Sequence, residues 1–285
     1  MSGVDAQLRA LVEAVTIESA GLARVVDVRG GVRDVSVANE RGPFLGLAEA
    51  LYSGHYNMRR EPGPSTGDDA EVFLNALRAA NRLPQRFAAG APLPREGITG
   101  QGGHYVMFGR AMTLAQTGRQ VRFYWNLPPA GAAPFVGAVT ERLERMRIPF
   151  QAKVPVHPAG YERSDSGVLY LGDDDLAVAC DAIEDVHAAV RPLLRDGVPL
   201  FALPLGRGVG FAESPPSGDS FGMHRCDLIA EGMVRAFERG AHSVDERTQI
   251  VRERLTAYGF DLERFAFNPT ARYPYRFPRL EEDAA

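Results

Sequence analysis

Residues 104–172 contain four strand-like segments around one helical segment, and this order constrains the fold more than any other feature of the sequence. One strand pair is indicated by HYVMFGRAMTL and RQVRFYWNL, and a second by IPFQAKVPV and GVLYLG, with the helix FVGAVTERLERMR between the pairs. Strands and helices that do not alternate regularly are typical of α+β proteins rather than of doubly wound parallel sheets. We therefore expect an α+β fold, with a mixed, largely antiparallel sheet flanked by helices, in a single domain.

The regions on either side of this segment are expected to be mainly helical. Apolar residues at helical spacing predict a first helix over residues 5–17, and two short strands, 23–30 and 32–39, follow as a hairpin. A buried strand is expected over residues 198–205, and helices near 226–240 and 245–258. We divide the chain into residues 1–42, an N-terminal helix and hairpin, and residues 43–285, which we expect to form one compact unit with the N-terminal part.

Composition excludes several classes of protein. The net charge of −4 argues against nonspecific nucleic-acid binding, so an anionic ligand must be held by a local arginine cluster. No apolar run approaches the ~20 residues of a membrane span, and no export signal is visible. Cys180 and Cys226 lack metal or redox spacing and are expected to be reduced thiols. We expect a cytoplasmic protein that requires no cofactor.

Lys153 is the first candidate for chemistry. It is the single lysine of the chain, because 31 of the 32 lysine and arginine residues are arginine. An ammonium group can be made neutral by burial and by neighbouring cations, and can then act as a base, whereas a guanidinium stays protonated. Strand alternation places Phe150, Ala152 and Val154 on one face and Lys153 on the other. The alternative is a surface lysine without a function.

Arginine, glycine and aspartate segments supply further candidates. Arg163 follows Tyr161 and precedes Asp165, so it can clamp an anion or form a surface pair with that aspartate. The glycine-spaced loop around Arg207 lets backbone amides approach an anion, although ordinary turns use glycine as often. The acidic run 173–175 is a turn and helix start more often than a metal site, and we expect no metal.

The six histidines show no metal-binding spacing, since neither an HExxH motif nor a close pair occurs. A single histidine is usually structural. His55 and His224 are the exceptions that we retain, because both lie among tyrosines or arginines in glycine-containing segments. His224 and Arg225 also precede a predicted helix, whose first amides favour anions.

Six motifs in order resemble the HopA-type effector family. They are LY-x-x-HY-x-x-R, VRFYWNL, IPFQAKV, YERSDSGVLYL, GVGFAESP and SFGMHR, and they lie between about residues 43 and 260. That family includes bacterial type III effectors and HopA-like phospholyase components of thioamitide and class V lanthipeptide biosynthesis. The resemblance implies a lyase acting with a separate Ser/Thr kinase-like partner. One departure is Ala202-Leu203, where other members often carry Thr-Lys.

The resemblance also implies a reaction and a set of roles. The kinase phosphorylates Ser or Thr of a ribosomally made precursor peptide, and the lyase eliminates the phosphate to leave dehydroalanine or dehydrobutyrine. Lys153 is then the base, and His55 or His224 the proton donor. The expected phosphate-binding residues are Arg163, Arg207, Arg225 and Arg122. The expected substrate-positioning residues are Tyr56, Glu213 and Ser220. The alternatives are a non-catalytic effector-like or scaffold protein that binds a peptide or protein partner, and a cyclase.

Overall fold

The computed structural model describes residues 3–57, 67–99, 103–111, 119–271 and 274–280. The chain forms two compact units, each assembled from three stretches of sequence. Unit 1 comprises residues 1–59, 199–202 and 213–271, and unit 2 comprises residues 60–198, 203–212 and 272–285. The expected limits at 1–42 and 43–285 stay a prediction, because packing into units is not a test of independent folding.

Unit 1 is helical with a small antiparallel sheet. The helix α1 (Gly3–Glu13) is followed by β1 (Val15–Ser19), β2 (Leu22–Val26) and β3 (Val32–Ser36), which form a sheet in the order β1-β2-β3. The helix α2 (Leu45–Leu51) continues into a π-helical turn, η1 (Tyr52–Tyr56). The long helices α6 (Phe221–Glu238) and α7 (Val244–Ala257) pack together, and the short turn η5 (Leu262–Arg264) follows them.

The core of unit 1 brings together α1 and α7, which are far apart in the sequence. Leu8, Leu11 and Val12 of α1 are buried, and α1 packs against α7. Arg252 of α7 also pairs with Asp5 of α1.

The helix expected over residues 5–17 is shorter in the structure. It ends at Glu13, and the β-branched run Val15, Thr16 and Ile17 forms a strand beside β2 instead.

Unit 2 is built on a seven-stranded sheet with the order β11-β12-β8-β10-β9-β7-β6. The strands are β6 (Glu96–Ile98), β7 (His104–Phe108), β8 (Gln120–Trp125), β9 (Phe150–Pro155), β10 (Gly167–Gly172), β11 (Leu203–Gly206) and β12 (Val209–Glu213, whose last residue belongs to unit 1). Pairs β6–β7, β7–β9, β9–β10, β10–β8 and β11–β12 are antiparallel. The predicted α+β class with a largely antiparallel sheet is confirmed.

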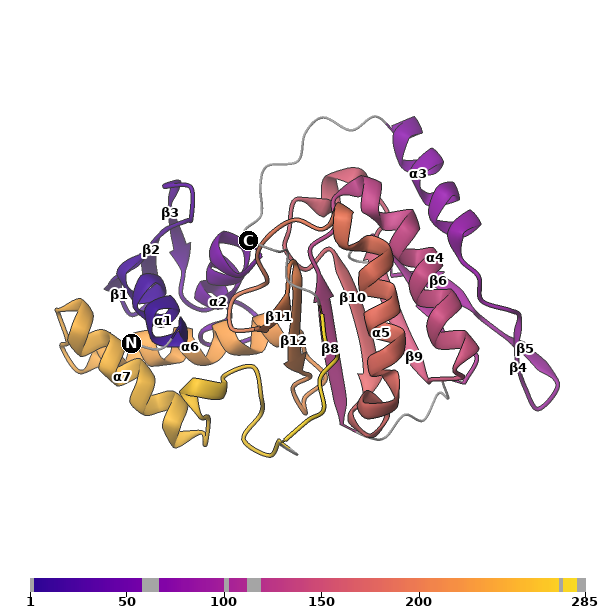
Figure 1. Ribbon diagram of the computed structural model, residues 1–285. Coiled ribbons are helices and arrows are strands. Elements are labelled where there is room, and N and C mark those ends of the chain that lie inside the picture. Colours follow the sequence, from indigo (N-terminus) through magenta and orange to yellow (C-terminus); the bar gives the residue numbers. More distant parts are fainter. Residues whose placement is uncertain (1–2, 58–66, 100–102, 112–118, 272–273, 281–285) are drawn as a thin grey trace. The chain divides into compact units, whose positions relative to one another are not determined.

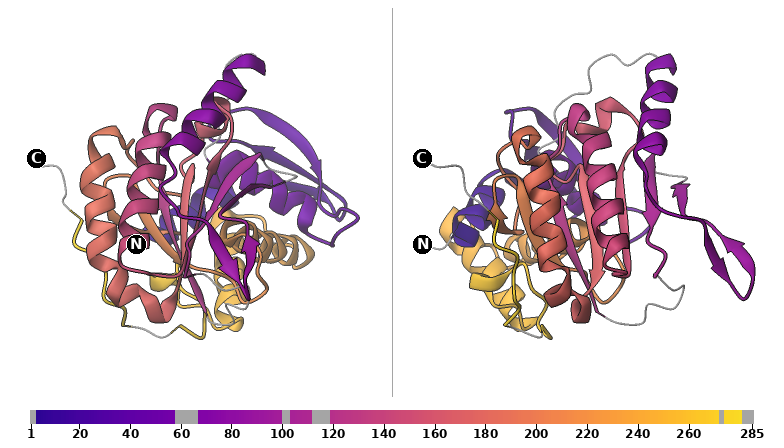
Figure 2. Two further views of the ribbon diagram at one scale, coloured as in Figure 1. Left: turned by 90° about the vertical axis from the view of Figure 1, so that its right-hand side faces the viewer. Right: turned by 45° about the vertical axis from the view of Figure 1, so that its right-hand side comes forward.

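Helices cover one face of this sheet, as Figures 1 and 2 show. They are α4 (Pro129–Arg145) and α5 (Leu176–Val190), with α3 (Gly67–Ala80) packed against α4. The indole of Trp125 lies 5.3 Å from the Phe135 ring of α4 and 6.4 Å from the His187 ring of α5, measured between ring centroids. The remaining elements are the hairpin β4 (Arg86–Ala88) and β5 (Ala91–Leu93), and the turns η2 (Pro158–Tyr161), η3 (Asp173–Asp175) and η4 (Arg191–Leu193).

Two predicted strand assignments differ from the structure. The strands β7 and β8 do not pair with each other, because β7 lies between β6 and β9 whereas β8 lies between β12 and β10. The expected strand over 198–205 begins only at Leu203. By contrast, β9 and β10 are neighbours as predicted, with Lys153 opposite Val168.

Candidate functional site

The sheet of unit 2 has an apolar face and a polar face, and strand register fixes which residues share each one. Residues directly opposite each other in paired strands project on the same side. Gln151 is opposite Tyr170, and Tyr170 is opposite Arg122, so the side chains of these residues share the face of Lys153. The predicted alternation in β9 is confirmed, since Phe150, Ala152 and Val154 are fully buried while Lys153 is half-buried.

Lys153 and Arg122 both lie against the ring of Tyr170. The Nζ atom of Lys153 is 5.5 Å from the ring centroid, and the Cζ atom of Arg122 is 5.2 Å from it. The electron-rich face of an aromatic ring attracts cations, so Tyr170 of β10 is in contact with one positive group from each of the strands that flank it, β8 and β9. Arg122 is only 6% exposed. Two cations on one partly desolvated face favour the binding of an anion.

Arg163 and Asp165 lie in the loop after η2. The Nε and Nη2 atoms of Arg163 both donate to the carboxylate of Asp165, which is 8% exposed. Although burial opposes this, the positive charge and hydrogen bonds of Arg163, followed by the charge of Lys153, lower the pKa of Asp165. Arg195 holds the loop in place by donating to the carbonyl oxygens of Tyr161 and Arg163. The pair is therefore a buried one rather than the exposed pair considered from sequence.

His104 is a site residue that the sequence did not single out. It begins β7 opposite Pro155, two positions along β9 from Lys153, and so shares the face of Lys153. Burial, followed by the charges of Lys153 and Arg163, lowers the pKa of His104 from 6.5 to about 4. Its imidazole is therefore neutral near pH 7. The alternation of HYVMF indicated which face of the strand His104 occupies, but it did not indicate that β9 is the neighbouring strand.

These residues form one group that we call the Lys153 cluster: His104, Arg122, Lys153, Arg163, Asp165 and Tyr170. Lys153, Arg122 and Arg163 carry three positive charges against the single carboxylate of Asp165. The cluster combines an amine that can serve as a base with guanidinium groups that can neutralise a phosphate or carboxylate. Within the described residues, the ammonium group of Lys153 makes no hydrogen bond or salt bridge, and it lies against the Tyr170 ring.

Arg207 lies in the turn between β11 and β12. Its Nε atom is 3.0 Å from a carboxylate oxygen of Asp196. The following residue, Gly208, has a φ of +64°, and a Cβ there would meet the carbonyl oxygen of Arg195 at 2.4 Å. The tight turn, with Asn126 donating to the Gly208 carbonyl at 2.8 Å, explains this glycine without a ligand. A phosphate-binding role for Arg207 stays a prediction.

The other six predicted residues belong to unit 1. His55 is 7% exposed, and burial is the main cause that lowers its pKa. Tyr56 is buried beside α6, where its ring centroid is 6.3 Å from that of Phe221. Ser220 is the residue before α6, and its side chain makes no capping hydrogen bond. Glu213 is buried and accepts from the backbone N–H of Asn268 at 2.7 Å. Their roles remain predictions.

Arg225 has a structural environment in unit 1. Its guanidinium is 0% exposed and donates to the carbonyl oxygens of Phe265 at 3.1 Å and Phe267 at 3.0 Å. It lies over the rings of Phe221, Phe260 and Phe265, 4.5 to 5.1 Å from their centroids. His224 Nδ1 is 2.8 Å from Arg225 Nη1. This geometry disfavours the predicted contact between Arg225 and a phosphate, because the guanidinium is enclosed and already donates hydrogen bonds to backbone carbonyl oxygens.

The described residues contain neither a metal-binding cluster nor a helix that could span a membrane. No group of three or more histidine, cysteine, aspartate or glutamate residues in that part of the chain has an arrangement suited to a metal ion. The run 173–175 forms the turn η3 immediately before α5. None of the described helices has the length and apolar character needed to cross a lipid bilayer.

Comparisons with known proteins show the family to which this chain belongs. The model of the HopA1 effector protein family matches residues 99–267, a span that includes the whole Lys153 cluster. No curated protein sequence matches the chain. The solved structure of an effector protein from Pseudomonas syringae pv. tomato strain DC3000 is similar with a TM-score of 0.60 and 19% identity, covering 94% of this chain and 96% of that one.

A second effector structure, from Pseudomonas syringae pv. syringae strain 61, has a TM-score of 0.53 and 22% identity, and covers 78% of this chain and 94% of that one. At these identities the two structures support the fold alone. The family model supports more, because it matches more than half of the 285 residues. The chain belongs to the HopA1 effector protein family.

Proposed function

We propose that the chain is a phosphoserine/phosphothreonine lyase, a carbon–oxygen lyase that acts on a phosphorylated peptide. The observation that supports this most strongly is the Lys153 cluster, in which a single amine and Arg122 share one face of a sheet and Arg163 lies in the loop before β10. A β-elimination needs a base for a weakly acidic proton and cations for the departing phosphate, and it needs no metal or organic cofactor.

In the proposed step, the neutral amine of Lys153 removes the α-proton of the phosphorylated residue. The electron pair of the Cα–H bond forms the Cα=Cβ double bond, and the Cβ–O bond breaks. The phosphate leaves with that bonding pair, so the products are a dehydroalanine or dehydrobutyrine residue, inorganic phosphate and a protonated lysine. Arg122 and Arg163 neutralise charge that develops on the leaving oxygen, and Asp165 fixes the orientation of Arg163.

Neutral His104 does not carry the proton that an acid would give to the leaving group at pH 7, because its pKa is about 4. His55 and His224, the proton donors expected from the sequence, and Tyr56, the expected positioning residue, belong to unit 1, and burial lowers the pKa of His55 as well, so these roles stay predictions. The substrate that we propose is a ribosomally made precursor peptide, phosphorylated by a Ser/Thr kinase-like partner. This context is proposed from the motif resemblance, and a cytoplasmic location fits it.

The test is the mass of a Ser/Thr-phosphorylated peptide after incubation with the purified chain. We expect loss of phosphoric acid with the wild-type protein and no loss with Lys153→Ala or Lys153→Arg, because neither variant supplies an amine base. Arg145→Lys is the matched control, since Arg145 is an exposed residue of α4 that pairs with Glu141.

Two results oppose the proposal. Elimination that persists in Lys153→Ala would remove the assigned base. No elimination by the wild-type chain, alone or with a kinase partner, would favour the alternative, a non-catalytic effector-like or scaffold protein. Binding of the phosphopeptide without elimination would separate that alternative from an inactive preparation.

A further inference from the structure

Unit 1 contains a cavity of about 280 Å³ beside the strand β1, in a part of the chain that the proposed elimination does not use. Its walls come from three segments: residues 15–17 of β1, the end of α6 and the corner that leads into α7. All of these residues belong to unit 1. The backbone of β1 and the side chains around the cavity determine what the cavity can bind.

The strand β1 is an edge strand whose outer backbone groups face this cavity. In an antiparallel pair, alternate residues exchange hydrogen bonds with the neighbouring strand and the others point away from it. The backbone N–H of Val26 donates to the carbonyl of Ala14 at 2.8 Å, so Ala14 is a hydrogen-bonded position and Thr16 is the next one along β1. The backbone N–H and C=O groups of Val15 and Ile17 therefore point away from β2. Arg247 confirms this orientation, because its Nη1 atom donates to the Val15 carbonyl at 2.7 Å.

Ile17 is then the position where the edge offers both an N–H and a C=O to a partner. An exposed strand edge is a template for a further strand, and several peptide-binding domains use it in this way. A partner residue opposite Ile17 would exchange two hydrogen bonds with it. A main-chain amide unit supplies a donor and an acceptor at this spacing, which favours an extended peptide over a small rigid ligand.

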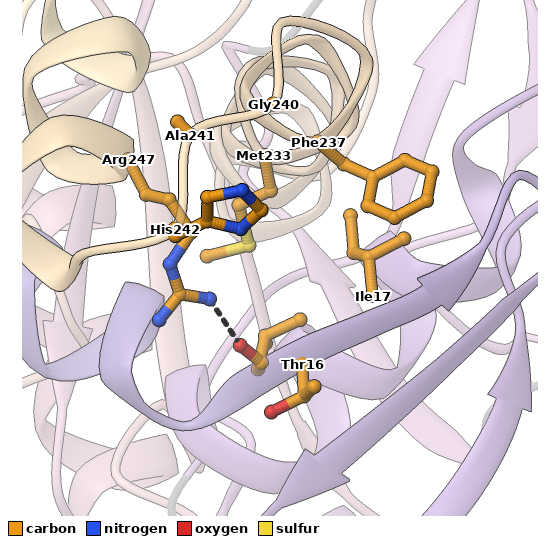
Figure 3. A pocket seen from close by; sticks show the side chains of 9 residues that line it. Thr16, Ile17, Met233, Phe237, Gly240, Ala241, His242 and Arg247 are labelled. Carbon is orange, nitrogen blue, oxygen red and sulfur yellow. Dashed lines mark hydrogen bonds between the residues drawn. The ribbon is translucent and has the colours of Figure 1, made fainter.

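The side chains around the cavity divide by chemistry, as Figure 3 shows. Ile17 and Phe237 lie on one side, and Phe237 is 38% exposed although it is a large apolar residue. Met233 of α6 lies partly behind the ring of His242 in this view. His242 and Arg247 lie on the other side. The Nε atom of Arg247 is buried and has no hydrogen-bond partner among the described residues. The cavity thus joins an apolar wall to a cationic one.

We propose that this cavity binds an extended peptide segment as an added antiparallel strand at Ile17. The peptide residue opposite Ile17 places an apolar side chain against Ile17 and Phe237. Strand pairing ends at Ile17, because Arg247 already donates to the Val15 carbonyl, and the carboxylate of the residue two positions later is held by Arg247 and His242. The ligand is therefore an apolar-x-acidic tripeptide within an unphosphorylated segment. This site does not depend on the lyase activity proposed for the Lys153 cluster.

The probe is acetyl-Ser-Leu-Ser-Glu-Ser-amide, and the signal is the methyl resonance of Met233. Protein labelled with [methyl-¹³C]methionine has seven such resonances, and Met233→Leu assigns the one of interest. We expect a saturable shift of that resonance with a dissociation constant on the order of 0.1–1 mM, because one residue pair and one side chain give weak binding. The resonance should not move with acetyl-Ser-Ala-Ser-Gln-Ser-amide.

Three changes distinguish strand addition from other binding. Methylation of the leucine backbone nitrogen removes the donor to the Ile17 carbonyl, and reversal to Glu-Ser-Leu misplaces the carboxylate; each should weaken binding about tenfold. Phe237→Ala should do the same, with its melting temperature as the check on folding. Phe87→Ala is the matched control, because Phe87 is an exposed phenylalanine of unit 2.

Defined results would overturn the inference. An unmoved Met233 resonance at 5 mM probe, well above the estimated dissociation constant of about 0.1–1 mM, excludes this ligand. Equal binding of the N-methylated peptide means that the cavity accepts a side chain or small molecule without strand pairing. Equal binding to Phe237→Ala that is folded places the peptide elsewhere.

Discussion

His104 gives a quantitative prediction, because its environment affects both stability and the charge of the Lys153 cluster. Burial and the positive charges of Lys153 and Arg163 lower its pKa from 6.5 to about 4. Between pH 4 and pH 6.5, His104 therefore binds fewer protons in the folded state than in the unfolded state. The free energy of unfolding should therefore fall as the pH falls from 6.5 to 4, and this change is complete below pH 4.

The size of the effect follows from the shift. A pKa near 4 in place of 6.5 corresponds to roughly 3 kcal/mol of unfolding free energy. The substitution His104→Gln removes the titrating group. Urea unfolding of the wild type and of His104→Gln at several pH values isolates the contribution of His104, because all other groups titrate in both proteins. We expect the wild type to lose about 3 kcal/mol more than His104→Gln between pH 7 and pH 4.

A direct titration adds a second measurement. The imidazole resonances of the six histidines can be followed by NMR, with His104→Gln assigning the relevant one. Replacing Lys153 by Met should raise the pKa of His104, because one repelling cation is lost, but not to 6.5, because burial is the larger cause. A His104 pKa of 6.5 in the wild type, or one unchanged in Lys153→Met, would refute the electrostatic coupling within the cluster.

Two further predictions concern unit 1. Gly222→Ala places a Cβ 2.4 Å from the Tyr56 ring and should cost about 1–3 kcal/mol of unfolding free energy, whereas Gly137→Ala, which meets nothing closer than 3.6 Å, should be neutral or slightly stabilising; urea unfolding of both variants compares them. Arg225→Met should cost about 2–4 kcal/mol by the same assay, because it leaves buried carbonyl oxygens without donors, and a stable but inactive Arg225→Met would instead favour the phosphate-binding role.

Local patterns predicted the parts of the structure that depend on neighbouring residues. Alternation in β9 placed Lys153 on the polar face, and β9 and β10, which follow each other in the sequence as strands, pair as predicted. The position of β7 was not predictable in the same way. Its neighbour β9 is more than forty residues later in the chain, so sequence order favoured β8 instead. His104 was missed for this reason, since only that pairing brings it beside Lys153.

Burial also changed the interpretation of particular residues. The sequence could not distinguish an arginine that faces solvent from Arg225, which is fully enclosed by aromatic rings and carbonyl oxygens. Similarly, Val15–Ile17 fitted the apolar spacing of a helix, and the availability of β2 as a partner decided that the segment is a strand. Both outcomes depend on residues far away in the chain.

The discontinuous composition of unit 1 has a consequence for synthesis on the ribosome. Its first 59 residues emerge early, but α6 and α7, which pack against α2 and α1 respectively, lie beyond residue 220. Leu8, Leu11 and Val12 therefore lack their packing partners until α7, which begins at Val244, has been made. The nascent N-terminal segment exposes apolar side chains during this time, which makes it a natural substrate for holding chaperones.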